Sequence, residues 1–134
     1  MVDSPSSAPY VELHCHSAYS FLDGASLPEE LVRAAGDLGH TALALTDHNS
    51  VSGSMELAQA AADHGVRAIH GAEIDVLACP AAEDPTGREG RRHLTLLVSD
   101  ERGWRNLCRI ITLAHAHTRD SSARREASEP WVDV

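Results

Sequence analysis

Residues 42–48 decide the fold, and their sequence is ALALTDH. Four consecutive apolar residues followed by polar ones are typical of a short strand buried on both faces, as strands of parallel sheets are. A helix is predicted on each side of this strand. The first is opened by Pro28 and ended by Gly39, and the second covers about residues 52–64. This alternation of strand and helix favours a parallel α/β fold.

The same alternation extends in both directions along the chain. Residues 10–16 alternate between polar and apolar types and predict a first strand, residues 66–76 contain a third, and residues 94–98 form a fourth. Asp100 is placed to cap a helix after the fourth strand. A (β/α)8 barrel usually needs ~250 residues. A chain of 134 residues with about four strand–helix units therefore predicts part of a barrel or a small open sheet.

Three regions are expected along the chain. Residues 1–9 are small and polar and predict a disordered leader, whereas residues 10–118 carry the folded units. Within them, residues 79–92 form a connection rich in Pro, Gly and charge. Residues 119–134 predict a flexible charged segment and the start of a further element.

Composition excludes several classes of protein. Hydrophobic residues make up 43% and charged residues 23%, as in soluble globular domains, and no apolar run is long enough for a membrane span. The net charge of −9 repels phosphate backbones, so this segment alone is expected to bind nucleic acid poorly. Three cysteines without a CxxC pair favour a reducing cytoplasm over a disulfide framework.

His14 and His16 are the sharpest local signal. On a strand their side chains leave the same face, and Cys15 between them points the other way. A metal ion about 2.0–2.1 Å from each nitrogen would satisfy two neighbouring imidazoles. The alternative is a pair of surface histidines on an edge strand.

Further polar residues follow the other predicted strands. Asp47 and His48 come directly after the buried run, and Glu73 lies late in the third strand, after a glycine at 71 that allows close approach of another group. The carboxyl ends of parallel strands meet at one edge of a sheet. We therefore expect these residues to share a site with His14 and His16.

The remaining candidates are more ambiguous on spacing alone. Asp23 lies in an Asp-Gly sequence that is equally typical of a plain turn. His93 begins the fourth strand, which in a parallel sheet is the wrong end for the site. Five other histidines are interpreted as structural or set aside: His40, His64, His70, His115 and His117.

The expected donor set indicates the chemistry. Mixed imidazole and carboxylate ligands suit Zn²⁺, Mn²⁺ or Fe²⁺. Several donors of each kind favour more than one ion, and neighbouring divalent ions activate water and clamp a phosphate ester. Hydrolysis of a phosphoester is therefore predicted, and no Walker loop, GxGxxG motif or Ser-His-Asp order competes with it.

Three motifs carry a resemblance to a known family: HCHS at residues 14–17, TDHN at 46–49 and GAE at 71–73. They resemble the PHP (polymerase and histidinol phosphatase) domain. Within that superfamily, YSFLDGAS at 19–26 and GWRNLC at 103–108 resemble the N-terminal region of bacterial DNA polymerase III alpha subunits. The sequences of these motifs are most similar to those of the error-prone branch of these polymerases.

The resemblance implies a fold and a ligand set. The fold would be a distorted TIM-like barrel of seven strands that holds up to three metal ions, of which this chain supplies about four strand–helix units. Asp47 would lie behind the ligands and orient His48 or a bound water. Further family ligands, a Cys or His and an Asp-x-His pair, would follow downstream of Val134. The implied metal ligands in this chain are His14, His16, Asp23, His48, Glu73 and His93.

The resemblance also implies a function and its alternatives. The chain would be the N-terminal PHP part of an error-prone DNA polymerase, whose parent protein synthesises DNA in damage tolerance and repair. Its partners would be the rest of the polymerase chain and, through other domains, DNA, with no membrane. The PHP part would act as a phosphoesterase, a proofreading exonuclease or a structural support. The alternatives are a separate phosphatase acting on a small phosphoester, such as histidinol phosphate or a nucleotide, and a binding module stabilised by metal.

Overall fold

The structure is a computed structural model that describes residues 10–77, 91–119, 130 and 132–133. The expectations for the leader, for residues 79–90 and for residues 120–129 lie outside these described residues. No helix in the described part is both long and apolar enough to cross a membrane. The elements are the helices α1 (Pro28–Asp37), α2 (Ser54–His64), α3 (Glu101–Ala114) and the short 3₁₀ helix η1 (Ala116–Arg119), and the strands β1 (Ala42–Leu45), β2 (Arg67–Leu77), β3 (Arg91–Leu97) and β4 (Val132–Asp133).

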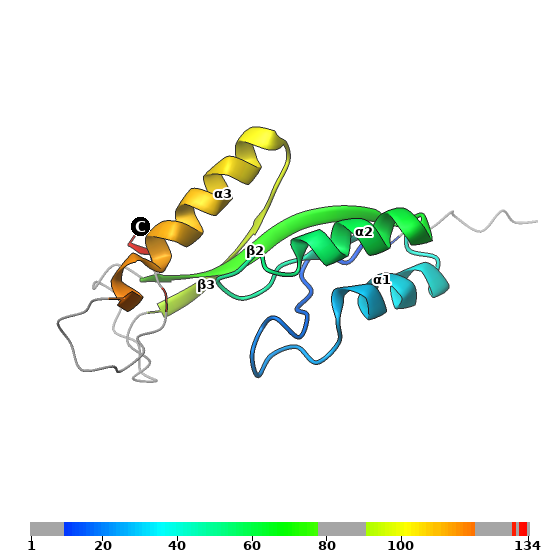
Figure 1. Ribbon diagram of the computed structural model, residues 1–134, viewed down its shortest axis with the longest axis horizontal. Coiled ribbons are helices and arrows are strands. Elements are labelled where there is room, and N and C mark those ends of the chain that lie inside the picture. The colour runs from blue at the N-terminus through cyan, green and yellow to red at the C-terminus, as the bar shows by residue number, and fades with distance from the viewer. Residues whose placement is uncertain (1–9, 78–90, 120–129, 131, 134) are drawn as a thin grey trace, which may run out of the picture.

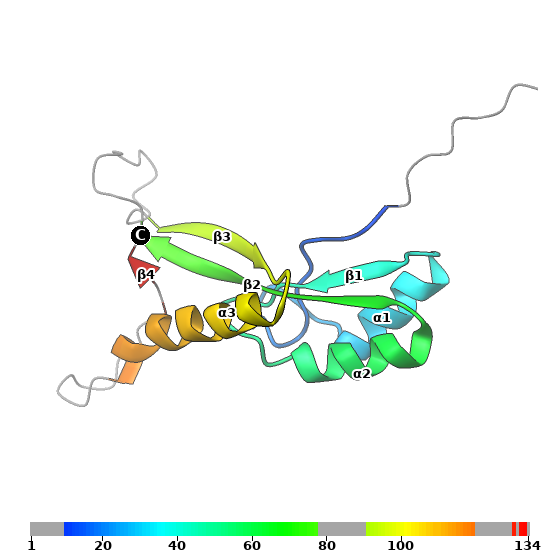
Figure 2. The same ribbon diagram turned by 90° about the horizontal axis from the view of Figure 1, so that it is seen from above.

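The long strand β2 organises the sheet. Its first part pairs in parallel with β1, from Ala42 opposite Arg67 to Leu45 opposite His70. Its second part, from Gly71 onward, pairs antiparallel with β3 on one edge and in parallel with the short β4 on the other. Figure 2 shows β1 and β3 beside successive parts of β2. The chain is thus a mixed α/β fold consistent with part of a barrel, as predicted.

The orientation of the fourth strand was predicted wrongly. The sequence analysis took every strand as parallel, whereas β3 runs antiparallel to β2. A parallel neighbour needs a crossover connection, usually a helix. Residues 78–90 contain two prolines and two glycines and offer no helical pattern. The next strand therefore returns along the edge of β2 that β1 leaves free.

The first predicted strand is extended but forms no regular ladder. Residues 10–16 run beside β1 with one isolated parallel bridge between Glu12 and Leu43. The Ala44 amide donates to the Glu12 carbonyl at 2.9 Å, and the Thr46 amide donates to the Cys15 carbonyl at 2.8 Å. These contacts place the His14–His16 segment along the edge of β1.

The helix boundaries follow the local signals. Pro28 opens α1, and Gly39 and Gly65 end the first two helices at φ angles of 77° and 67°. A residue other than glycine adopts this left-handed backbone at a cost. The Asp100 side chain accepts a hydrogen bond from the Gly103 amide at 2.7 Å and caps α3. The predictions made for Pro28, Gly39 and Asp100 are confirmed.

Helices α1 and α2 lie beside one end of β2 and α3 beside the other (Figure 1), and an apolar cluster lies at each end. One packs α1 and α2 against β1, with Val32 and Leu57 fully buried, and the other packs α3 against the second part of β2 around Ile74. Along that part of β2, alternate residues face α3. The intervening residues, Glu73 and Asp75 among them, face the opposite side, where the polar cluster described below is found.

Candidate metal centre

Two buried carboxylates on β2 form the base of the site. Glu73 is 7% exposed and Asp75 is 5% exposed, and both leave the same face of the strand because they are two residues apart. Gly71 precedes them, and a side chain there would place its Cβ 2.5 Å from the Leu96 carbonyl oxygen. The predicted close approach at this glycine is therefore real, and the group that approaches is the backbone of β3.

Glu73 contacts histidines through both of its oxygens. Its Oε2 lies 2.5 Å from Nε2 of His14 and 3.8 Å from Nε2 of His16. Its Oε1 accepts a hydrogen bond from Nδ1 of His93 at 2.8 Å and lies 3.4 Å from Nδ1 of His48. The carboxylate therefore lies between two pairs of imidazoles.

The strand ends bring these residues together. His14 and His16 share a face, as predicted, and their Nε2 atoms are 3.2 Å apart. His48 follows β1 and forms an isolated parallel bridge with Glu73. Asp23, on the loop before α1, is more peripheral, because its Oδ2 lies 3.9 Å from Nδ1 of His48 and its side chain is 55% exposed.

His93 was expected at the wrong end of its strand, and the structure corrects this. Because β3 is antiparallel, its beginning lies beside the end of β2, and His93 is directly opposite Asp75 in the register. Residues directly opposite in an antiparallel pair share a face. The orientation of β3 therefore brings His93 to Glu73.

Asp47 supports the loop beneath the site. It is 1% exposed, and its carboxylate accepts hydrogen bonds from the Ser17 amide at 2.7 Å and from the hydroxyls of Ser17 and Ser20 at 2.9 Å. Oγ of Ser20 in turn accepts a hydrogen bond from the His48 amide at 2.9 Å. Asp47 therefore reaches His48 through Ser20, and its described contacts hold the loop that carries Asp23.

The other histidines lie outside the cluster. Nδ1 of His64 donates to the Ala60 carbonyl on its own helix, and the rings of His40 and His70 pack against Tyr10 and Trp104. The side chain of His117 is outside the described residues. His115, which the sequence analysis set aside, donates from Nε2 to the carbonyl of Asn49 at 3.0 Å, beside the site.

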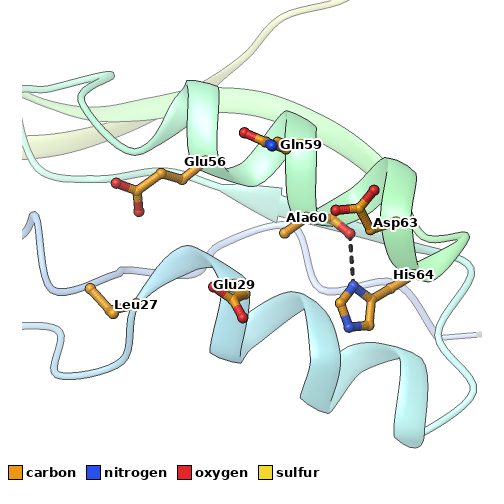
Figure 3. A pocket seen from close by; sticks show the side chains of 7 residues that line it. All are labelled: Leu27, Glu29, Glu56, Gln59, Ala60, Asp63 and His64. Carbon is orange, nitrogen blue, oxygen red and sulfur yellow. Dashed lines mark hydrogen bonds between the residues drawn. The ribbon is translucent and has the colours of Figure 1, made fainter.

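A groove between α1 and α2 is separate from this cluster. It has a volume of about 330 Å³, and Figure 3 shows Asp63 and His64 on its α2 wall, where both are exposed. None of the clustered carboxylates or histidines lines it. Its lining consists of Leu27, Glu29, Glu56, Gln59, Ala60, Asp63 and His64.

Burial and charge act in opposite directions on Glu73. Burial raises the pKa of its carboxyl, but the hydrogen bonds from His93 and His14 and the charges of His16 and His14 outweigh that effect and hold the pKa below its ordinary value. Cys15 packs into the first apolar cluster, and burial raises the pKa of its thiol. A thiol with a raised pKa is a poor metal ligand at neutral pH.

The donor set fits divalent metal ions. Two groups of three side chains bring their ligand atoms within 4.8 Å of one another, one made of His14, His16 and Glu73 and the other of His48, Asp75 and His93. In the second group, Nδ1 of His48 and Oδ1 of Asp75 are buried and have no hydrogen-bond partner among the described residues. A cation would satisfy such atoms.

Asp75 is the site residue that the sequence analysis missed. The signal was present, because a residue two positions after Glu73 on a strand must share its face. Asp75 lies inside the strand predicted within residues 66–76, but the motif that carries the family resemblance there, GAE at residues 71–73, ends before it.

Comparisons with known proteins agree with this geometry. The PHP domain family profile matches residues 12–133. Error-prone DNA polymerases from Mycobacterium bovis and Mycobacterium tuberculosis are each 50% identical over 112 residues, which cover 82% of this chain and 10% of the relative. The relative from Cutibacterium acnes is 43% identical over 107 residues, 80% of this chain and 9% of its own length. The chain therefore spans about a tenth of the relatives it matches.

Solved structures show the same fold. A protein from Bifidobacterium adolescentis described as a metal-dependent phosphoesterase superposes with a TM-score of 0.57 at 23% identity, over 84% of this chain and 36% of that one. An amidohydrolase from Chromobacterium violaceum gives 0.54 at 29% identity, over 75% and 32%. With the family profile and the polymerase relatives, these matches confirm the predicted resemblance, and the chain belongs to the PHP domain family.

Proposed function

We propose that this chain is the PHP part of an error-prone DNA polymerase and that its histidine and carboxylate cluster holds divalent metal ions for phosphoester hydrolysis. The observation that carries the proposal is the Glu73 carboxylate, which is buried between two pairs of histidines. The identity of 50% to error-prone DNA polymerases supports the choice of parent protein over a separate small phosphatase.

The proposed ligands share one region of the fold, the junction where β2 passes from its pairing with β1 to its pairing with β3. Within this proposal, residues 10–118 are the N-terminal part of the PHP domain, and a complete domain would hold up to three ions of Zn²⁺, Mn²⁺ or Fe²⁺. The ligands carried by this chain would be His14, His16, Asp23, His48, Glu73 and His93.

Bound divalent ions would lower the pKa of a coordinated water and offset the charge of a phosphate ester. The residues of the chain prepare the place for this chemistry. The histidines around Glu73 hold its pKa below the ordinary value and so favour its ionised form, whose negative charge lies between the histidine pairs. Asp23 and His93 are more than half exposed and lie on the open side of the site, where a substrate can reach them.

The partners follow from the same assignment. The chain carries a net charge of −9, which disfavours direct binding of a DNA backbone. We therefore propose that DNA is held by other domains of the polymerase, that the rest of that chain is the main partner, and that the protein works in the cytoplasm with its DNA.

The test uses a polymerase chain that carries this segment. The metal-stripped enzyme is assayed with Zn²⁺, Mn²⁺ or Fe²⁺ on a single-stranded oligonucleotide and on a nucleoside monophosphate. We expect metal-dependent cleavage of the phosphodiester, and Glu73→Gln should abolish it. The control variant His64→Ala, in the groove between α1 and α2, should cleave as well as the wild type (Figure 3). Cleavage of the monophosphate alone would favour the separate phosphatase. Cleavage unchanged in Glu73→Gln would reject the proposed site.

A further inference from the structure

Asp75 occupies a position that suits a metal ligand. It lies on β2 on the same face as Glu73, is 5% exposed, and is directly opposite His93 in the antiparallel register. Its Oδ2 is 3.2 Å from Nε2 of His48, and its Oδ1 is 3.6 Å from Nδ1 of His93. The resemblance that implied the ligands at His14, Glu73 and the other positions implied no role for Asp75.

Asn49 fixes the orientation of the Asp75 carboxylate. The Asn49 side chain donates to Oδ2 of Asp75 at 3.2 Å and accepts from the Asp75 amide at 3.0 Å. Asn49 adopts a φ of 49°, a left-handed conformation that a residue other than glycine adopts at a cost. His115 donates to the Asn49 carbonyl from α3 and adds support to this conformation. The carboxylate is therefore held in place from outside the histidine cluster.

One oxygen of this carboxylate remains unsatisfied. Oδ1 of Asp75 is buried and accepts no hydrogen bond from any residue that the structure describes. A buried polar atom without a partner costs roughly 1–3 kcal/mol, and more when it is charged. Asn49 holds the Asp75 carboxylate through Oδ2 and the Asp75 backbone through its amide, while Oδ1 is left unpaired. This arrangement indicates a missing charged partner at Oδ1.

The spacing matches a cation with three ligands. Two ligand atoms that each lie about 2.1 Å from one ion are at most ~4.2 Å apart. The separation of 3.2 Å between Oδ2 of Asp75 and Nε2 of His48 falls within this limit, as does that of 3.6 Å between Oδ1 of Asp75 and Nδ1 of His93. One ligand atom from each of the three residues lies within 4.8 Å of the others, and the His93 side chain is 57% exposed, which leaves its ring room to adjust.

We propose that Asp75 binds a divalent transition-metal ion together with His48 and His93, at a site separate from the one formed by His14, His16 and Glu73. This inference rests on the proposed metal-dependent function and adds a ligand to it. Glu73 then lies between two ions, with Oε2 toward the His14 side and Oε1 toward the His93 side.

The test counts Co²⁺ ions on the metal-free chain by equilibrium dialysis and records the visible absorption of bound cobalt. We expect two ions per chain. Asp75→Asn keeps the size and the hydrogen bonds of the side chain but removes the charge, so one ion should be lost or weakened by about 100-fold, with its absorption bands. The ion at His14, His16 and Glu73 should remain and shows that the variant is folded.

Two further variants make the result decisive. His93→Gln replaces an exposed ring and should remove the same ion as Asp75→Asn does. The double variant Asp75→Asn/His93→Gln should lose that ion and no other. Asp63→Asn, in the α1–α2 groove, should keep both. Unchanged cobalt binding in Asp75→Asn would overturn the proposal. So would loss of both ions together in Asp75→Asn, or a different ion lost in His93→Gln. Because no hydrolysis is measured, a failure of the proposed catalytic function would leave this result intact.

Discussion

Nδ1 of His93 donates a hydrogen bond to Oε1 of Glu73 at 2.8 Å, and this bond joins the two neighbouring antiparallel strands β3 and β2. The other oxygen of Glu73 faces His14. The Glu73 side chain therefore contacts both the N-terminal segment that carries His14 and the strand β3 that carries His93. Its removal is expected to affect the histidines on both sides.

We predict that Glu73→Gln, in a polymerase chain that carries this segment, lowers bound metal and reduces phosphodiester hydrolysis by about 100-fold or more. The neutral amide cannot hold two cations or balance the histidines. His14→Ala should remove one ion and also abolish hydrolysis. The measurements are elemental analysis and a nuclease assay.

Two controls accompany this prediction. His64→Ala should leave metal content unchanged, because Nδ1 of His64 bonds to its own helix away from the site. Nucleotide addition by Glu73→Gln should also be retained wherever the variant stays folded, since the proposal places that activity in other domains. Equal metal loss in His64→Ala would contradict the cluster described above.

Asp47 is predicted to stabilise the fold independently of metal. Its buried carboxylate accepts hydrogen bonds from Ser17 and Ser20. In Asp47→Asn, an NH₂ group would replace one carboxylate oxygen, and this group cannot accept the hydrogen bonds that the serines donate. The free energy of unfolding of the metal-free chain should fall by about 2–3 kcal/mol. Urea denaturation measures it, with exposed Asp63→Asn expected within about 0.5 kcal/mol of wild type. A loss seen only in the presence of metal would indicate a direct role at the ions instead.

The sequence predicted the part of the site that depends on local pattern. His14 and His16 share a face because side chains on extended backbone alternate, and Asp47 and His48 follow a buried strand whose apolar run is continuous. Glu73 followed from the same reasoning about strand ends. The three helix boundaries were also predictable, because capping residues and helix-ending glycines act over one turn.

The rest depended on pairing between distant segments. His93 could be placed only with the orientation of β3, which pairs antiparallel with β2 along the edge that β1 leaves free. Asp75 shares the face of Glu73 by local alternation, but the pairing of β3 decides that His93 lies opposite it. The contact between Asp47 and the loop at Ser17 joins residues 30 positions apart. No local periodicity encodes such contacts, so the sequence left them open.

Gly71 and Gly36 provide a matched pair of glycine substitutions. A Cβ at Gly71 would lie 2.5 Å from the Leu96 carbonyl oxygen, so Gly71→Ala must push β3 away from β2. We expect a loss of about 2–3 kcal/mol in unfolding free energy and weaker metal binding through displacement of His93. Among the described residues, a Cβ at Gly36 on α1 would meet only Val66, at 3.7 Å, and Gly36→Ala should stabilise the helix by about 0.5–1 kcal/mol. Thermal and urea unfolding compare the two, and a stable Gly71→Ala variant would contradict the close approach.

His70 lies on β2 outside the cluster, and its ring packs edge-on against Trp104 with the ring centroids 5.6 Å apart. Its Nδ1 is buried and has no hydrogen-bond partner among the described residues. Burial lowers the pKa of this histidine below its ordinary value, because a charged imidazole is poorly solvated there.

This shift fixes the sign of a pH effect on stability. The unfolded chain, with a histidine pKa of about 6.5, binds a proton at a higher pH than the folded chain does. The contribution of His70 is therefore complete above that pKa and is lost as the pH falls through it toward the lower folded-state pKa. We predict that metal-free wild type loses more unfolding free energy between pH 7.5 and pH 5 than His70→Phe, which keeps an aromatic ring but cannot titrate. Urea denaturation followed by circular dichroism gives the difference between the two proteins, in which the other histidines cancel. Parallel pH profiles for both would show that His70 is as easily protonated in the folded chain as in the unfolded one.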